Sequence, residues 1–360
     1  MLLKFLKSQL KKFRLELAQK KASKEDIPPI PLKIKKLNRH QKQLIKEKWS
    51  GLIDNLDLGY IAYLRYISLD KFDVNYVPSS YYYPLIIRAL NPINNIASYE
   101  HKGLNIFNYP PPFLQQPDTV LNSIRGIFYD SENVKLTFDE ALDKLSSFEN
   151  DMIIKPSTGS CSGRNVRMIK RNTDSSEIAS LLKDYNGDFI VQKKVDQSQF
   201  TGQFNPTSLN TMRIPTLYIN GKFSVLAAIL KIGADGAIVD NMCSGSGSTW
   251  VEINPDGTLK EWGRNKKLET VRERNGISFA NKKVPNFSKI INTVKQAHLM
   301  KPAIGLIGWD IALNSDNEPL FIEANLFWPS VKEVQDVHGP LFGERLDEVI
   351  QYTKSYHNIH

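Results

Sequence analysis

Short runs of β-forming residues alternate with turn signals over much of the chain after residue 150, and this alternation constrains the fold more than any other feature. Asn-Gly or Asp-Gly dipeptides at residues 220–221, 235–236 and 256–257 separate apolar runs. Such dipeptides favour tight hairpin turns, so the neighbouring strands should pair antiparallel. Helix-like segments precede the strands, and the predicted fold class is therefore α+β. The apolar runs are residues 189–192, 213–219, 224–232, 249–253, 307–313 and 320–323.

Residues 2–21 predict an amphipathic helix ahead of that sheet. Apolar residues recur at spacings of three and four, and basic residues occupy much of the remainder. Two interpretations are open: an interfacial helix on anionic lipid, or a helix packed on its own globule or on a partner protein. Pro28, Pro29 and Pro31 should end the helix in a linker. The apolar positions are Leu3, Leu6, Leu10, Phe13 and Leu17, and the basic ones are Lys4, Lys7, Lys11, Lys12 and Arg14.

The chain has 360 residues and a net charge of +9, and this charge is concentrated at its start. Residues 1–50 contain 15 Lys and Arg against 4 Asp and Glu, whereas the other residues contain 32 against 34. Because the rest of the chain is nearly neutral, we expect it to bind no nucleic acid. Any binding to an anionic membrane or to a partner protein should involve the basic first 50 residues, the N-terminal arm. Cys161 and Cys243 are too few for a disulfide framework, and no apolar run approaches the roughly 18 residues of a membrane span. The expected location is cytoplasmic. The basic N-terminal arm also suggests a peripheral position at the inner face of the membrane.

Composition divides the chain into four predicted segments. Residues 1–37 form the basic helix and its linker, and residues 38–149 a helical and mixed region. The other two segments are residues 150–196 and residues 197–360. The many tyrosines of the second segment favour core packing over a stacking site for sugars or bases.

A lysine precedes a loop of small residues near the start of the β-rich part. Residues 152–154 form a short apolar strand, Lys155 follows it, and Ser157, Gly159 and Ser160 belong to the loop. The backbone N–H groups of such a loop can surround phosphate oxygens while the lysine adds a fixed positive charge. The pattern matches neither the Walker nor the GxGxxG motif, and a plain hairpin turn is an equally good explanation.

Two strands near the end of the chain carry a metal-binding pattern. Asp310 lies in an apolar run, a polar turn follows, and Glu323 and Asn325 lie two residues apart on one face of the next run. Two carboxylates and an amide oxygen suit Mg²⁺, which completes its shell with water and substrate phosphates. Polar residues on a solvent-facing edge are the alternative, but the apolar neighbours predict a buried sheet in which unpaired carboxylates are costly.

Arg213 stands at the start of a further core strand. An arginine in this position can bind a phosphoryl group or a carboxylate bidentately. A surface ion pair is the alternative that the residue alone leaves open.

These elements, in this order, resemble the ATP-grasp superfamily, and more narrowly its sugar-transfer-associated branch found with polysaccharide biosynthesis. The similar segments are residues 189–195, 208–214, 226–241 and 309–325, and the resemblance covers roughly residues 100–350. It implies an ATP-grasp fold, with a small lid-like α+β subdomain at residues 150–196 and a larger antiparallel-sheet subdomain at residues 197–360. ATP and one or two Mg²⁺ ions would be held between these two subdomains.

The resemblance also implies roles for individual residues. Lys155, with the loop residues Ser157, Gly159 and Ser160, would hold the α- and β-phosphates, and Lys102 would be the earlier phosphate-binding lysine. Arg213, together with Lys155, would act on the transferred phosphoryl group. Gln192, Lys193 and Val195 would line the adenine cleft, Asp196 would contact the ribose, and Asp310, Glu323 and Asn325 would bind the metal.

The implied reaction is ADP-forming carboxylate–amine ligation through an acyl-phosphate, on a sugar-linked or polysaccharide-precursor substrate. Positioning and charge neutralisation suffice for this chemistry, so Cys161 is not expected to be a catalytic thiol. An ATP-dependent kinase of a sugar or alcohol, and a non-catalytic nucleotide-binding scaffold subunit, remain as alternatives. Candidate substrate contacts are Asp240, Asn241, Arg88 and Arg164.

Overall fold

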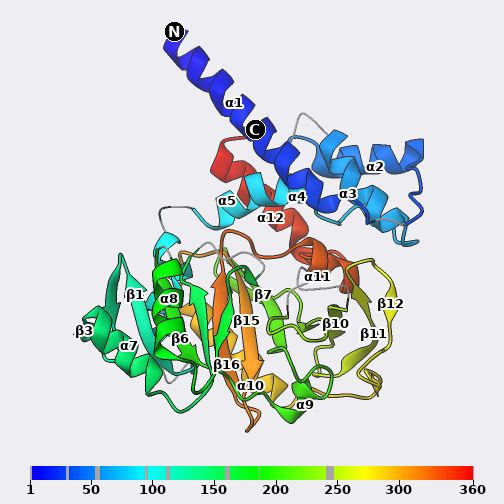
Figure 1. Ribbon diagram of the computed structural model, residues 1–360. Helices are drawn as coiled ribbons and strands as arrows, with labels where there is room; N and C mark the ends of the chain where they lie inside the picture. The colour runs from blue at the N-terminus through cyan, green and yellow to red at the C-terminus, as the bar shows by residue number, and fades with distance from the viewer. Residues whose placement is uncertain are drawn as a thin grey trace.

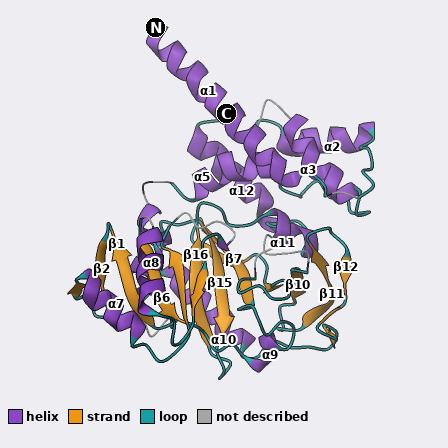
Figure 2. Ribbon diagram, in the orientation of Figure 1, coloured by secondary structure: helices purple, strands orange, loops and turns teal. Residues whose placement is uncertain are grey.

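The computed structural model places a helical region over one end of two β-sheets that lie side by side (Figures 1 and 2). It describes residues 2–29, 32–52, 57–92, 94, 96–110, 114–158, 163–185, 187–240 and 247–359. Both sheets are antiparallel, so the predicted α+β class with a large antiparallel component is confirmed.

The helical region packs tyrosines and a tryptophan into a core that continues onto the end of the larger sheet. The rings of Tyr66 and Tyr76 stack with centroids 3.7 Å apart, and Trp49 Nε1 donates a hydrogen bond of 2.7 Å to the Tyr63 hydroxyl. These aromatic side chains are buried, which agrees with the expected preference for core packing. The helices are α1 (Leu2–Ser23), α2 (Arg39–Trp49), α3 (Asp57–Ile67), α4 (Ser79–Tyr81), α5 (Ile87–Leu90), α11 (Lys332–Val337) and α12 (Leu346–His357), with a π-helical turn at Tyr82–Ile86.

The C-terminal part of α1 packs against the helical region. Ala22 and Ser23 are buried, and a short 3-10 turn, Lys24–Asp26, follows the helix. Asp26 is buried and accepts hydrogen bonds from the backbone N–H of Ser79 at 2.8 Å and from the Ser79 hydroxyl at 2.6 Å. The N-terminal part of α1 projects away from the rest of the molecule (Figure 1). Among the described helices, none is long and apolar enough to cross a membrane.

The smaller sheet has six strands in the order β3-β2-β1-β6-β4-β5. Two helices pack against each other beside it, and Thr137 with Glu140 forms a capping box that starts the first of them. The sheet begins at Thr119, upstream of the boundary predicted at residue 150, because β1 pairs with β6. Its elements are β1 (Thr119–Ile124), β2 (Ile127–Tyr129), β3 (Lys135–Leu136), α7 (Phe138–Ser146), β4 (Met152–Pro156), β5 (Arg167–Ile169), α8 (Ser175–Asp184) and β6 (Phe189–Lys193).

The larger sheet has eight strands, with the path β12-β11-β10-β9-β7-β15-β16 and β8 paired to β7. Asn220 and Gly221, both with positive φ, form the tight turn from β7 to β8, as the sequence predicts. The Asp235-Gly236 turn instead lies within a longer connection between β9 and β10, which still pair antiparallel. The elements are α9 (Gln199–Gly202), β7 (Thr211–Ile219), β8 (Lys222–Val225), β9 (Ile229–Ile232), β10 (Thr249–Ile253), β11 (Leu259–Asn265), β12 (Thr270–Val271), α10 (Phe287–Leu299), β15 (Leu306–Leu313) and β16 (Pro319–Asn325), with a separate β13 (Glu273–Arg274) and β14 (Ile277–Ser278) pair.

Candidate active site

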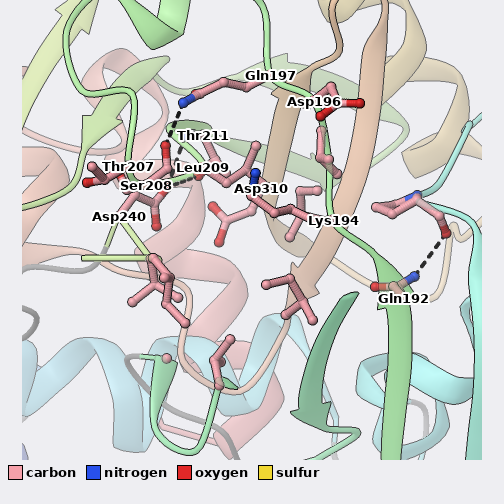
Figure 3. Close-up of a pocket in the computed structure, with 18 of the residues that line it drawn as sticks. Gln192, Lys194, Asp196, Gln197, Thr207, Ser208, Leu209, Thr211, Asp240 and Asp310 are labelled. Carbon is pink, nitrogen blue, oxygen red and sulfur yellow. Dashed lines mark hydrogen bonds between the residues drawn. The ribbon is translucent and has the colours of Figure 1, made fainter. Parts of the chain in front are cut away.

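A cavity of about 680 Å³ lies between the two sheets. One wall comes from β4, β5 and β6 of the smaller sheet, and the other from β7, β9, β15 and β16 of the larger sheet. The connection after β6, residues 194–199, crosses from one sheet to the other and closes one side. In Figure 3, Thr211, Asp240 and Asp310 lie close together on one side of the cavity, and Gln192 lies on the other side.

Two lysines face this cavity. Lys155 lies on β4, and Lys102 lies in a 3-10 turn, Lys102–Leu104, whose first backbone N–H donates to the carbonyl of Ser157 at 2.9 Å. Burial first, and then the charge of Lys102, lower the pKa of Lys155 to about 8, although Glu323 opposes the shift. The smaller sheet therefore holds a concentrated positive charge in a partly desolvated place, which favours a polyanionic ligand.

The carboxylate hairpin predicted from the sequence forms and brings its three polar side chains together. Asp310 on β15 is the cross-strand partner of Glu323 on β16, and Asn325 pairs with Gly308 two residues further along the ladder. Asn325 Nδ2 lies 3.4 Å from Asp310 Oδ2 and 3.5 Å from Glu323 Oε1. Glu323 Oε2 lies 3.2 Å from Lys102 Nζ, which links the hairpin to the lysine side of the cavity.

Arg213 does not form a surface ion pair but binds Asp310 in the interior. The two residues are direct cross-strand partners on β7 and β15, and Arg213 donates to both Asp310 carboxylate oxygens, at 2.7 Å from Nε and 3.0 Å from Nη2. Its third nitrogen, Nη1, donates to the Ser330 hydroxyl at 3.1 Å. This bidentate geometry fixes the plane of the Asp310 carboxylate.

Lys231 is the functional candidate that the sequence reasoning missed. It lies on β9, and its Nζ is 3.2 Å from Asp310 Oδ2 and 3.4 Å from Asp240 Oδ1. Asp240 Oδ2 also accepts from the backbone N–H of Thr211 at 2.9 Å. The signal in the sequence is a lone lysine inside the apolar run 226–232, where a charge is tolerated only if it is paired.

Burial and ion pairing shift the pKa values of Asp310, Asp240 and Lys231 in opposite directions. Burial alone would raise the pKa of Asp310, but Arg213 and Lys231 outweigh it and hold that pKa well below its usual range. Burial raises the pKa of Asp240 in spite of Lys231, so the second carboxylate is the more easily protonated of the two. Burial would lower the pKa of Lys231, yet Asp240 and Asp310 raise it, and the ammonium group stays charged.

The hairpin residues fit a hard cation by the chemistry of their donors. Among the described residues, no three His, Cys, Asp or Glu side chains converge on one point, so the candidate set is two carboxylates and an amide. Asp310, Glu323 and Asn325 offer carboxylate and amide oxygens, the donors that Mg²⁺ prefers. Rotation of the Asn325 amide by half a turn would present its oxygen to such an ion.

Strand β6 and the connection that follows it form the side of the cavity predicted for a nucleoside. Gln192, Lys193, Val195 and Asp196 all line the cavity. Gln192 Nε2 donates to the carbonyl of Pro117 at 3.1 Å, and the Lys193 backbone N–H donates to that of Asp118 at 2.9 Å. These two groups are therefore hydrogen-bonded within the protein. The groups left to contact a base belong to the residues that follow Lys193, in the connection after β6.

The remaining predicted residues lie elsewhere or outside the described chain. Gly159, Ser160, Cys161, Asn241 and Cys243 fall outside the described residues. Ser157 is buried behind the cavity wall, where its N–H donates to the carbonyl of Asp188 at 2.8 Å, and Arg164 is not among the described lining residues. Arg88 was predicted as a substrate contact, but it is exposed on α5 and lines a second pocket beside α1, because the other residues of this turn face the core.

Two lysines that face a carboxylate hairpin across a cleft between two antiparallel sheets are the arrangement that an ATP-grasp fold implies. The chain matches the family model described as "Sugar-transfer associated ATP-grasp" over residues 128–351. The protein belongs to this family, and the resemblance inferred from the sequence is confirmed.

Solved structures with similarity to this chain include several ligases and synthetases. One is N5-carboxyaminoimidazole ribonucleotide synthetase, with 13% identity over 64% of this chain and 45% of that chain and a TM-score of 0.40. Another is the D-alanyl-alanine synthetase A of Vibrio cholerae, with 11% identity over 71% of this chain and 66% of that chain and a TM-score of 0.42. The D-alanine–D-alanine ligase of Coxiella burnetii shares 13% identity over 74% and 61% of the two chains, with a TM-score of 0.42. The chain thus spans less than two thirds of the length of each of these proteins, and no curated protein matches it.

Proposed function

We propose that the protein is an ATP-dependent, ADP-forming carboxylate–amine ligase acting on a sugar-linked or polysaccharide-precursor substrate. The observation that carries the proposal is the meeting, in one cavity, of Lys102 and Lys155 with the Asp310–Glu323–Asn325 hairpin. Family membership supports the nucleotide and the kind of pathway, and the solved structures with similarity to this chain include a D-alanine–D-alanine ligase.

The cavity offers separate places for the base and the phosphates of ATP. Ile153, Val166 and Met168 from the smaller sheet face Leu209 and Ile322 from the other side, and these apolar surfaces would stack on adenine. Lys102 and Lys155 lie beyond them and would neutralise the α- and β-phosphates. Asp310, Glu323 and Asn325 would hold Mg²⁺, which supplies charge neutralisation for the β- and γ-phosphates.

The buried charges behind the hairpin suit the transfer step. In the proposed reaction a substrate carboxylate oxygen attacks the γ-phosphorus and ADP leaves. An amine then attacks the acyl carbon, inorganic phosphate leaves, and the amine gives up its proton. Lys231 lines the cavity and is fixed by Asp310 before substrate arrives, so it would stabilise negative charge without reorganising at the moment of transfer. Arg213 does not line the cavity, and it would act through the carboxylate of Asp310 that it orients.

Asp240 is the proposed contact for the amine. Its carboxylate faces the cavity, and the pKa is raised by burial despite the neighbouring Lys231, so it can hold an ammonium group or accept the released proton. Thr211 fixes its orientation through the hydrogen bond to Oδ2.

The test is ADP release from ATP and Mg²⁺ in the presence of panels of sugar acids and amines, with mass spectrometry of the product. The proposal predicts release only when both substrates are present, and a product with the summed mass of the two less one water. Lys155→Ala and Glu323→Gln should abolish release, whereas the matched exposed variants Lys170→Ala and Asp316→Asn should retain it. A phosphate-ester product would replace the ligase with a kinase, and nucleotide binding without turnover would favour a scaffold.

A further inference from the structure

The N-terminal helix α1 leaves large apolar side chains in solvent. Leu10, Phe13 and Leu17 are 49%, 57% and 52% exposed, although the same helix buries Ala22 and Ser23 against the protein. The spacing of three and four places the three apolar side chains on one face of the helix. The projecting part of α1 in Figure 1 therefore carries an apolar stripe that its own protein does not cover.

A second pocket, of about 390 Å³, lies beside Leu10 of this stripe. It is lined by α1, the π-helical turn, α5 and α12. Its floor is apolar, and Arg14 of α1 and Arg88 of α5 line it together. None of the described residues that line it is acidic. Two guanidinium groups beside an apolar floor can bind a phosphodiester whose attached chains remain in an apolar phase. The lining residues are Leu10, Arg14, Leu15, Pro84, Leu85, Arg88 and His357.

The charge of the chain complements an anionic surface at this place. The first 50 residues carry 15 Lys and Arg against 4 Asp and Glu, while the rest of the chain is close to neutral. An amphipathic basic helix with exposed Leu and Phe has the composition of helices that lie in the headgroup region of a bilayer. A second copy of this chain would bring the same positive charge to the same face, which opposes self-association there.

We propose that α1 and the Arg14–Arg88 pocket bind an anionic phospholipid bilayer, with Leu10, Phe13 and Leu17 among the acyl chains and one headgroup phosphate between the two arginines. Binding of this kind is peripheral and reversible. The Asp26–Ser79 hydrogen bonds and the buried end of α1 transmit the attachment to the rest of the protein. The proposal is independent of the reaction that the cavity between the sheets performs.

Co-sedimentation of the full-length protein with lipid vesicles tests this proposal. Vesicles of phosphatidylglycerol and phosphatidylcholine should sediment the protein, vesicles of phosphatidylcholine alone should bind it about tenfold less well, and added salt should weaken the binding. The triple variant Leu10→Ser, Phe13→Ser, Leu17→Ser and the double variant Arg14→Gln, Arg88→Gln should each lose about tenfold or more in affinity for the anionic vesicles.

A matched control removes three apolar side chains from other exposed places. Ile127→Ser, Val134→Ser and Leu299→Ser lie away from α1, are 38%, 56% and 41% exposed in the native protein, and should leave vesicle binding unchanged. Thermal unfolding of every variant checks that it is folded. The proposal is overturned if the native protein does not bind anionic vesicles, or if the triple serine variant and the double glutamine variant both bind them as the native protein does. A concentration-dependent dimer, lost in the triple serine variant of α1 and formed without vesicle binding, would show that a second copy covers the stripe.

Discussion

Lys155 should reduce the stability of the nucleotide-free protein, because the partly desolvated ammonium group lies near Lys102. Its pKa falls from the ordinary 10.5 to about 8 in the folded chain. One pKa unit corresponds to about 1.4 kcal/mol, so keeping Lys155 charged in the folded state costs about 3 kcal/mol at neutral pH. Lys155→Met, which keeps most of the side-chain volume, should therefore raise the free energy of unfolding at pH 7 by up to about 3 kcal/mol.

The sign of the pH dependence follows from the lowered pKa. Between about pH 8 and pH 10.5 the unfolded chain binds the Lys155 proton and the folded chain does not, so native stability rises with pH in this window. Below about pH 8 the whole cost is present. The stability advantage of Lys155→Met should thus be largest at pH 7 and should shrink as the pH rises through this window.

Urea unfolding of the native protein and Lys155→Met, at several pH values and without nucleotide, measures the effect. Lys170→Met, an exposed lysine just beyond β5, serves as the control and should change the free energy of unfolding little at any pH. Addition of ATP and Mg²⁺ should narrow the difference, because the native protein gains more from binding than the variant does. A Lys155→Met protein that is less stable than the native protein at pH 7, or a difference that does not vary with pH, would refute the reasoning.

Three further expectations concern buried charges and the metal hairpin. Asp310→Asn should lower the free energy of unfolding by about 3 to 5 kcal/mol in urea titrations, because Arg213 and Lys231 lose their shared counter-ion. Asp316→Asn, in the exposed turn of the same hairpin, should change the free energy of unfolding little. Burial raises the pKa of Asp26 from 3.8 to about 7, so the free energy of unfolding should fall by about 4 kcal/mol as the pH rises through that interval. Asp26→Asn should flatten this fall, and an unchanged pH profile in the variant would contradict the assignment. Glu323→Gln should weaken the dependence of nucleotide binding on Mg²⁺ concentration in calorimetric titrations, and an identical dependence in the variant would remove Glu323 from the metal set.

Local patterns in the sequence predicted the parts of the site that depend on neighbouring residues. Glu323 and Asn325 share a face because they are two apart on a strand, and a turn signal follows the Asp310 strand, so the hairpin could be derived without a structure. Lys155 was recognisable because a strand ends there and a loop of small residues begins.

What the sequence could not show depends on pairings between distant segments. Lys231 faces Asp310 only because β9, β7 and β15 lie in this order in the sheet, and the chain separates the two residues by 79 positions. The smaller sheet extends back to β1 for the same reason, since β1 pairs with β6 across a long connection. Arg88 was misplaced because the orientation of a one-turn helix depends on the core that covers its other residues.

Nucleotide binding by calorimetry tests the central claim most directly, because it needs no knowledge of the carboxylate or the amine. The claim is that the cavity between the sheets binds a magnesium nucleotide through Lys155 on one wall and Glu323 on the other. The native protein and Lys170→Met should bind ADP with Mg²⁺ with equal affinity, whereas Lys155→Met and Glu323→Gln should each bind at least about tenfold more weakly. Absence of binding by the native protein, or equal binding by all four proteins, would contradict the claim.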